Sequence, residues 1–291
     1  GERAILQQTN QPFIVHLRFA FQSDKKLYLV TDYYNGGNLL MHLSQHKTFT
    51  YEQTVFYAAE ILSALEYLHS KNIIYRDLKL ENLMMDHHGH LALIDFGLSK
   101  HNFVGAEGAS TFCGTSFYLA PEIIKGQHYG FGVDYWALGV LIYEMLRGRS
   151  PYYDSRGKKV VFMKILRAKP SYNPDYFPPD AVEVCSGLMR LDQENRLGSK
   201  RVEQATALRR ERFFATIDFD ALSRKELQPP FVPDVSGPED TRYVGKSYTK
   251  LDPYRESSAD PELEIKAAKR VAKNPDQNEF CNMGFTYDGE K

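Results

Sequence analysis

Three short strings constrain this chain more than any other feature of its sequence. YRDLKLEN occupies residues 75–82, DFG residues 95–97 and APE residues 120–122. The first string brings together an acid, a lysine and an amide, and the second places an acid directly after the apolar stretch 91–94. Each string alone occurs by chance, but the order of all three makes coincidence a poor explanation. The sequence therefore predicts a polar site built from loops beside short strands.

The strings resemble the catalytic loop, the metal-binding motif and the end of the activation segment of eukaryotic-type protein kinases. That resemblance implies an α+β, bilobal protein-kinase-like fold with a helical large lobe and, here, an extended C-terminal tail. A Gly-rich loop and a lysine-bearing strand do not precede the first string, so we expect the sequence to start inside a kinase domain. The expected parts are a remnant of the small lobe at 1–34, the large lobe at 35–214 and the tail at 215–291.

Composition is that of an ordinary globular protein. The 291 residues are 43% hydrophobic and 25% charged, with a formal net charge of −1. This balance favours neither a nucleic-acid nor a membrane role, and no apolar run approaches the ~18 residues of a membrane span. The 3 cysteines lack a metal-like spacing and fit reduced thiols. We expect a protein of the cytoplasm or the nucleus.

Hydrophobic periodicity and turn residues predict the order of elements. A capping box at 50–53 opens a helix with one apolar face, which ends near 69–72. The nearly continuous apolar run at 133–147 predicts a helix buried on most sides. The other predicted elements are helices at 2–8, 160–167 and 181–190, strands at 14–22, 26–33, 83–85 and 91–94, a hinge at 35–37, and an extended, Pro-punctuated tail after residue 228.

The acids and the amide of the first two strings suit phosphoryl transfer, which needs an oriented acceptor hydroxyl and metal ions that neutralise phosphate charge. Asp77 is the predicted positioner and base, and Lys79 would neutralise charge on the transferred group. Asn82 and Asp95 carry the oxygen donors that Mg²⁺ prefers. Taken singly, these side chains are as easily explained as turn residues or a cap at a strand end. ATP and Mg²⁺ are the expected cofactors.

A switch is predicted in the segment between the second and third strings. Arg76 precedes the predicted base, and in protein kinases with this arrangement that arginine receives a phosphate, because a guanidinium forms bidentate bonds to phosphate. Thr111 is the expected phosphoacceptor for an upstream kinase. Thr115 is the expected partner of the predicted base and lysine. A lone threonine in a polar loop is more often only solvated, and that alternative stands beside the prediction.

Further residues narrow the resemblance to the AGC group of Ser/Thr kinases, with greatest similarity to protein kinase B and the serum/glucocorticoid-regulated kinases. They are Tyr75 in place of the commoner His, TFCGT at 111–115, PPF at 229–231 and PEDTRY at 238–243. The resemblance covers residues 2–245. It implies protein substrates and a regulatory tail that wraps the small lobe.

The same resemblance implies roles for residues around the nucleotide. Thr31 would gate the adenine pocket, and Asp32 and Tyr34 would offer backbone groups to adenine. The remaining assignments are Glu2 as the partner of a strand lysine, Asn38 and Glu81 near the ribose, Met84 under the adenine ring, and Leu6, Leu17, Tyr75 and Phe96 as a hydrophobic spine. Asp134 would tether the catalytic loop, and Arg196 would pair with Glu122, for which a weak surface ion pair is the plainer alternative.

Two departures from the family pattern fall near the expected substrate site. Asn38 stands where the family usually has a glutamate that contacts the ribose and a substrate arginine. Ser116-Phe117 stands where the family usually has Pro-Glu. Glu81 and Glu144 keep two acidic positions for substrate arginines, although solvated or internally paired carboxylates are an alternative. We expect a basophilic enzyme with a weakened arginine preference at one position. Phe117 predicts an apolar preference just beyond the acceptor.

Phe285-Thr286-Tyr287 resembles the family's hydrophobic motif, in which a phosphorylated Ser/Thr follows an aromatic residue, although Asn282 stands where a second aromatic is expected. Two alternatives to a protein Ser/Thr kinase remain. One is a pseudokinase scaffold that binds partners without catalysis, and the intact acids and amide argue against it. The other is a small-molecule phosphotransferase, and the segment 111–122 argues against it because it suits a peptide.

Overall fold

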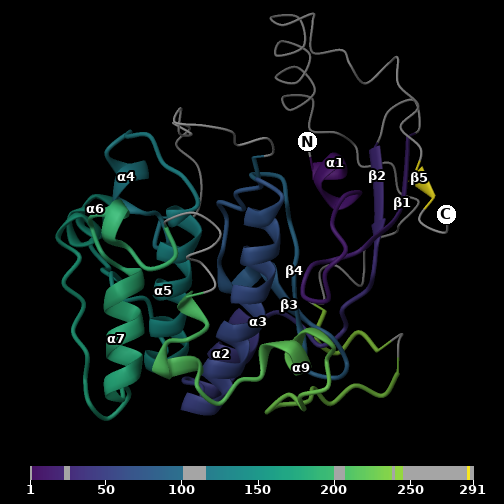
Figure 1. Cartoon of the computed structure of the whole chain (residues 1–291). Helices are drawn as coiled ribbons and strands as arrows, with labels where there is room; N and C mark the ends of the chain where they lie inside the picture. Colours follow the sequence, from purple (N-terminus) through teal and green to yellow (C-terminus); the bar gives the residue numbers. More distant parts are fainter. Residues whose placement is uncertain are drawn as a thin grey trace, which may run out of the picture. The chain divides into compact units, whose positions relative to one another are not determined.

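The computed structural model describes residues 2–22, 27–100, 116–199, 207–237, 240–244 and 287–288 (Figure 1). The chain divides into two compact units, one of Gly1–His16 and Tyr33–Asp240, the other of Leu17–Asp32 and Thr241–Lys291. Thr111, Thr115 and Thr286 lie outside the described residues. The domain boundaries expected after residues 34 and 214 stay predictions.

The smaller unit contains an antiparallel sheet in the order β2-β1-β5. Its strands are β1 (Leu17–Gln22), β2 (Leu27–Thr31) and β5 (Tyr287–Asp288). The strands predicted at 14–22 and 26–33 therefore form, although β1 starts three residues later than predicted. Phe21 stacks on Tyr28, its partner on the facing strand, with ring centroids 4.8 Å apart. Such cross-strand aromatic pairs stabilise a two-stranded register.

The larger unit is mainly helical, and its described sheet is the antiparallel hairpin β3–β4 (Leu83–Met85 and Leu91–Leu93). Its helices are α1 (Glu2–Leu6), α2 (Leu39–His46), α3 (Tyr51–Ser70), α4 (Pro121–Ile124), α5 (Gly132–Arg147), α6 (Lys158–Arg167), α7 (Pro179–Leu188) and α9 (Phe219–Ser223), with 3-10 turns η1 (Leu80–Asn82), η2 (Gln193–Asn195) and η3 (Arg212–Phe214). Every helix predicted above is present, with ends shifted by about two residues. Among the described residues, no helix is long and apolar enough to cross a membrane.

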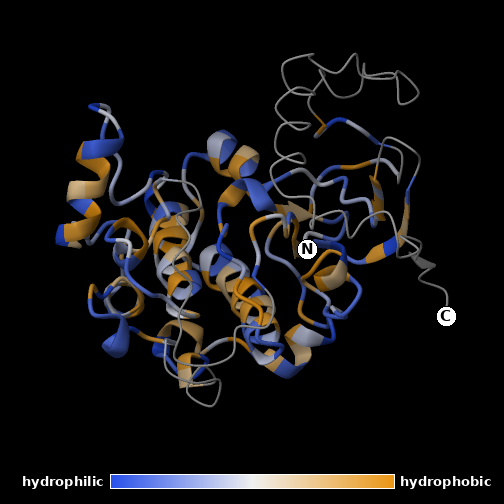
Figure 2. Cartoon of the chain, turned by 90° about the horizontal axis from the view of Figure 1, so that it is seen from above, coloured by the Kyte–Doolittle hydropathy of each residue, from blue (hydrophilic) through white to orange (hydrophobic). Residues whose placement is uncertain are grey.

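Helices α3 and α5 pack on each other at the centre of this unit, and hydrophobic residues dominate the central helices in Figure 2. α5 is buried on nearly every side, as its apolar run predicts. The prediction of one apolar face for α3 is wrong, because 15 of its 20 residues are buried. The physical reason is that α5, α9, β4 and η3 all pack on α3, so its polar residues are buried as well.

Local residues set the ends of these helices. Thr50 Oγ1 accepts from the Gln53 N–H at 3.2 Å, and Gln53 Oε1 accepts from the Thr50 N–H at 2.9 Å, which confirms the predicted capping box. α5 ends at Gly148, whose φ is 80°. A Cβ at Gly148 would lie 2.1 Å from the Lys47 carbonyl oxygen, so both the backbone angle and the space require glycine.

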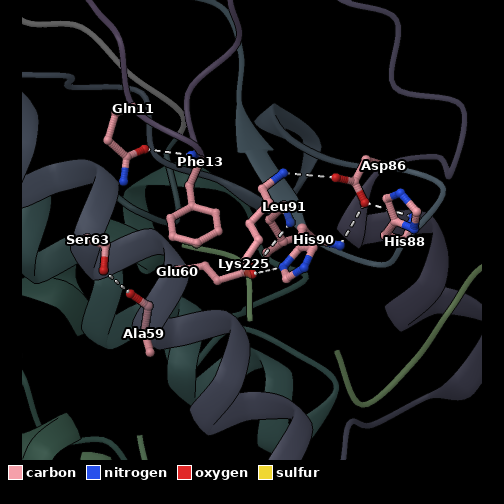
Figure 3. A network of polar contacts seen from close by, with 10 residues as sticks. All are labelled: Gln11, Phe13, Ala59, Glu60, Ser63, Asp86, His88, His90, Leu91 and Lys225. Carbon is pink, nitrogen blue, oxygen red and sulfur yellow. Dashed lines mark hydrogen bonds and ion pairs between the residues drawn. The ribbon is translucent and has the colours of Figure 1, made fainter. Parts of the chain in front are cut away.

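A buried polar network fastens the β3–β4 hairpin to α3 (Figure 3). Glu60 is fully buried, and its Oε1 lies 2.6 Å from His90 Nδ1 while its Oε2 accepts from the Leu91 N–H at 2.8 Å. Burial raises the pKa of Glu60. At the hairpin turn, Asp86 accepts from the His90 N–H at 2.9 Å and pairs with Lys225 at 3.0 Å. The start of β4, the strand that leads into DFG, is therefore held to α3, and the turn before it is held to Lys225.

The first part of the tail lies on the larger unit. The ring of Phe231 meets the rings of His42 and His46 edge-on, at centroid distances of 5.0 and 5.7 Å. Asn35, the first residue of the predicted hinge, donates from Nδ2 to the Gly237 carbonyl at 2.9 Å. The wrapping of the small lobe by the tail stays a prediction.

Candidate active site

One buried acid holds the loop of the first string. Asp134, in the first turn of α5, accepts from the Arg76 N–H at 2.8 Å and from the Tyr75 N–H at 2.9 Å, and its Oδ2 lies 2.8 Å from His69 Nε2. Arg76 has a φ of 71°, which a residue other than glycine keeps only when its surroundings enforce it. The tether predicted for Asp134 is present. His69 of α3 belongs to it as well, and no motif of the sequence had indicated that.

Three polar side chains of this loop converge. Asp77 Oδ2 lies 2.5 Å from Lys79 Nζ and accepts from Asn82 Nδ2 at 3.0 Å. Asn82 Nδ2 also donates to the Asp77 carbonyl at 2.9 Å. Asp77 and Asn82 are buried, whereas the Lys79 side chain is 19% exposed. The carboxylate is thereby held in one orientation, next to a cation that can meet a second negative group.

The second string follows β4 directly. Asp95 is exposed and has a φ of 59°, and its Oδ1 accepts from the Gly97 N–H at 3.1 Å. The ring of Phe96 is fully buried and meets Tyr75 at a centroid distance of 5.2 Å and 69°. The Phe96 N–H donates to Glu2 Oε1 at 3.2 Å. Two of the predicted spine residues therefore touch, and Glu2 of α1 is bonded to the backbone of DFG.

Asn82 and Asp95 have the chemistry of a divalent-cation site. Asn82 directs its Nδ2 to Asp77, which leaves Oδ1 as its ligand atom, and Asp95 presents an exposed carboxylate. The Ile94 N–H donates to the Asn82 carbonyl at 3.0 Å and so links the two loops. In the part of the chain that the structure describes, no group of three or more His, Cys, Asp or Glu residues could hold a metal. Mg²⁺ commonly completes its coordination with waters and phosphate oxygens.

Arg76 is directed toward the segment that follows DFG. Its Nε donates to the Leu98 carbonyl at 2.6 Å and its Nη1 to the Tyr129 hydroxyl at 3.2 Å. Its expected phosphate donor, Thr111, lies outside the described residues, as does Thr115. The switch therefore stays a prediction.

Glu81 and Glu144 form an acidic pair with a third member, Tyr118. The Tyr118 hydroxyl donates to Glu144 Oε2 at 2.6 Å. Burial raises the pKa of Glu144 to about 7; the Tyr118 bond opposes that rise, and the charge of Glu81 adds to it. Glu81 Oε2 is buried and has no hydrogen-bond partner among the described residues. A cationic side chain would offset the negative charge of both carboxylates. No sequence motif had pointed to Tyr118.

Asn38 has a structural role that the sequence analysis missed. Its Oδ1 accepts from the Met41 N–H at 2.9 Å and caps α2. An asparagine directly before an apolar helical stretch is a cap signal and could have been recognised. Asn38 also forms an isolated antiparallel bridge to Met84 of β3.

The other residues predicted around the nucleotide are divided between the units. Leu17, Thr31 and Asp32 belong to the smaller unit, where the Thr31 hydroxyl donates to the Asp32 carbonyl at 3.3 Å. Tyr34 and Met84 belong to the larger unit and are half-buried. Their roles toward adenine stay predictions.

Phe117 directly precedes Tyr118 and is half-buried. Its ring lies 6.1 Å from that of Tyr153, centroid to centroid, with an interplanar angle of 27°. Tyr153 is 52% exposed. No sequence signal had pointed to Tyr153, which lies on the connection between α5 and α6.

The pair predicted between Glu122 and Arg196 is present, and the alternative of a weak surface ion pair is wrong. Arg196 Nη1 and Nη2 donate to the two Glu122 oxygens at 2.5 and 2.9 Å, and both side chains are buried. Arg196 also donates to the carbonyls of Arg190 and Gly132 and lies over the ring of Trp136. The third string is therefore anchored in the core of the larger unit.

Comparison with known proteins identifies the family. The protein kinase domain model matches residues 1–209, and the chain belongs to the protein kinase family. The expected α+β kinase fold is thereby confirmed.

Among curated proteins, the chain is 40% identical over 291 residues to a RAC family serine/threonine-protein kinase homolog of Dictyostelium discoideum, covering all of this chain and 62% of that relative. It is 43% identical over 248 residues to the RAC-beta serine/threonine-protein kinase of Homo sapiens, covering 85% of this chain and 51% of the relative. The serine/threonine-protein kinase gad8 of Schizosaccharomyces pombe is 44% identical over 272 residues, which are 94% of this chain and 47% of gad8. The resemblance to protein kinase B-type enzymes is confirmed, and the chain spans about half to three fifths of these relatives' lengths.

Proposed function

We propose that this chain is the catalytic part of a protein Ser/Thr kinase that transfers the γ-phosphate of ATP to Ser or Thr hydroxyls of protein substrates. The observation that carries the proposal is the cluster of Asp77, Lys79 and Asn82, in which one carboxylate is oriented by an ammonium group and an amide. Asp95, on the adjoining loop, supplies the second oxygen ligand for Mg²⁺. The names of the relatives, all serine/threonine-protein kinases, agree with it.

In this reaction Asp77 orients the acceptor hydroxyl and takes its proton, while the hydroxyl oxygen bonds to the γ-phosphorus and the bond from that phosphorus to the β,γ-bridging oxygen breaks. Lys79 stabilises the charge of the transferred group. Asn82 and Asp95 hold Mg²⁺, which supplies charge neutralisation for the phosphates when it is bound. Glu2, Thr31, Asp32, Tyr34 and Met84 serve the nucleotide as the family resemblance implies.

Substrate preference is basic in this proposal. Glu81 and Glu144 take substrate arginines, which the raised pKa of Glu144 and the unpartnered oxygen of Glu81 support. Asn38 replaces a carboxylate and weakens the preference at one position. Phe117 adds an apolar preference just beyond the acceptor.

Activity is controlled by phosphorylation. An upstream kinase phosphorylates Thr111, and the phosphate pairs with Arg76, whose guanidinium already faces the segment after DFG. Thr115 is the proposed partner of Asp77 and Lys79, and Thr286 is the proposed second phosphorylation site; both lie outside the described residues.

The test replaces Asp77 in the full-length protein. Asp77→Ala should lower peptide phosphorylation by about 10³-fold while nucleotide binding is retained, because Asp77 orients the acceptor and not the nucleotide. Asp175→Ala removes an exposed carboxylate outside the site and should leave turnover unchanged. Near-normal turnover of Asp77→Ala would refute the catalytic role. A full-length protein that binds ATP and transfers no phosphate would instead be a pseudokinase scaffold.

A further inference from the structure

Positive charge is concentrated in one segment of the chain. Residues 147–169, from the end of α5 to just past α6, contain eight Lys or Arg residues and a single acid, Asp154. The chain as a whole is balanced, with 36 basic and 37 acidic residues. The charge of this segment is therefore a local property and not a consequence of composition.

Only some of these cations are neutralised. Asp154 pairs with Arg156 at 2.8 Å and with Lys164 at 2.9 Å, and Arg147 lies over the ring of Tyr176 at 4.7 Å from its centroid. The remaining cations are exposed and have no ion-pair partner within the described part of the chain. They are Arg149, Lys158, Lys159, Arg167 and Lys169.

The outer face of α6 combines this charge with apolar surface. Lys159, Met163 and Arg167 follow one another at intervals of four residues and are all exposed, with Met163 at 52%, whereas Val161 and Ile165 face the core. The helix itself gains nothing from the lysines of its first turn, because its dipole favours anions there and the turn contains no acid. Local stability does not explain the arrangement.

The helix that carries this face adjoins the segment that holds the substrate in the proposed function. α6 packs on α4, the short helix of the APE string, and the two lie next to each other in Figure 1. Tyr153 stacks on Phe117, and Lys164 Nζ fixes the connection by donating to the Tyr153 carbonyl at 2.8 Å. The exposed ring of Tyr153 thus lies between the end of the activation segment and the basic helix.

We propose that the outer face of α6, together with Tyr153, is a docking surface for an acidic segment of the protein substrate. The docked segment carries Glu or Asp residues opposite Lys159 and Arg167 and an aromatic or aliphatic residue against Met163 and Tyr153. A protein is favoured over a lipid surface or a nucleic acid because apolar side chains stand between the cations and because the chain has no overall positive charge. The identity of the ligand as a substrate rests on the proposed function.

A binding measurement tests the surface without catalysis. The probe is a fluorescein-labelled peptide of repeated Glu-Glu-Phe, compared with the peptide that has Gln for every Glu. At about 50 mM salt, the 291-residue chain should bind the acidic peptide about tenfold more tightly than the Gln peptide. This difference in affinity should be smaller at about 150 mM salt. Lys159→Glu with Arg167→Glu should abolish the difference, and Met163→Ala should weaken binding about threefold with no change of charge.

The matched control is Arg210→Glu with Arg212→Glu, which makes the same charge change at exposed residues at η3. An equal loss of acidic-peptide binding in this control would overturn the proposal, since binding would then depend on net charge alone. Displacement of the peptide by phosphatidylserine vesicles or single-stranded DNA that bind more tightly would also overturn it.

A kinetic measurement separates this inference from the proposed function. In the full-length protein, adding the Glu-Glu-Phe segment to a short peptide substrate should lower KM about tenfold, and the α6 double variant should lose this gain while its activity on the short peptide is unchanged. Absence of all phosphorylation would refute the proposed function and leave the binding result intact. Activity without a KM gain would refute substrate docking alone.

Discussion

Two groups of acids in the larger unit have opposite environments. Asp77 and Asp134 are buried, but each has partners: Asp77 has Lys79 and Asn82, and Asp134 has two backbone N–H groups and His69. Burial and the charge of Glu81 raise the pKa of Glu144, and no cation accompanies the two acids within the described residues.

The first group holds a loop, whereas the second is the group that we propose to recognise a ligand. The first group is complete in the chain itself, so it orients the catalytic loop before any substrate arrives. In the proposed function, the substrate brings the positive charge that the second group lacks among the described residues. Stability is therefore gained at the first group and given up at the second, a pattern common at functional sites.

The largest loss of stability is expected when Asp134 is removed from the first group, in which each acid has its partners. Asp134→Ala would leave the N–H groups of Tyr75 and Arg76 buried without an acceptor, and we expect the free energy of unfolding to fall by about 3–5 kcal/mol. Urea denaturation of the variant measures this. Asp134→Asn, which keeps an acceptor oxygen, should lose less. Equal stability of Asp134→Ala and the unmodified chain would show that the loop does not depend on its tether.

Replacing Glu144, in the group without a cation among the described residues, should change the free energy of unfolding in the opposite direction. The pKa of Glu144 is raised from 4.5 to about 7, so its contribution to stability is full below pH 4.5 and is lost as pH rises through 7. Glu144→Gln should therefore stabilise the chain by up to about 3 kcal/mol at pH 8 and by nothing at pH 4. Thermal or urea unfolding at both pH values tests this, and a destabilised variant at pH 8 would contradict it.

The same titration should appear in substrate selection. With a pKa of about 7, Glu144 is about one tenth ionised at pH 6 and about nine tenths at pH 8. We expect kcat/KM for an arginine-containing peptide, relative to one lacking arginine, to rise by up to about tenfold over this range. The rise should vanish in Glu144→Gln. A flat ratio in the unmodified full-length protein would separate Glu144 from arginine recognition.

The smallest effect concerns Asn38. This residue combines a structural role, as the cap of α2, with a position at which the family usually has a carboxylate. Asn38→Glu should raise arginine selection about fivefold, since a neutral bond becomes a charge-assisted one. It should also cost about 1 kcal/mol through the lost cap. Asn38→Asp keeps a capping oxygen and should retain stability. A positional peptide library and urea unfolding measure the two effects, and undiminished arginine selection without any gain in Asn38→Glu would remove Asn38 as a determinant.

Local sequence was sufficient wherever a short stretch contains its own partners. The capping box of Thr50 and Gln53 lies within four residues, and Asp77, Lys79 and Asn82 lie within one loop, so both could be predicted before any fold was known. The buried helix α5 followed from its continuous apolar run. The prediction for α3 failed because periodicity reports the hydrophobicity of a helix and not how many neighbours surround it.

The sequence by itself determined the family, the order of the elements and the set of side chains in the catalytic loop, because these depend on neighbours along the chain. Only the tertiary structure decided that the predicted pair of Glu122 and Arg196 is buried in the core and that Tyr118 holds Glu144. It also decided that Tyr153 stacks on Phe117 beside a basic helix. The physical reason is that burial and charge depend on segments far apart in sequence, and the pKa of Glu144 depends on which of them exclude water from it.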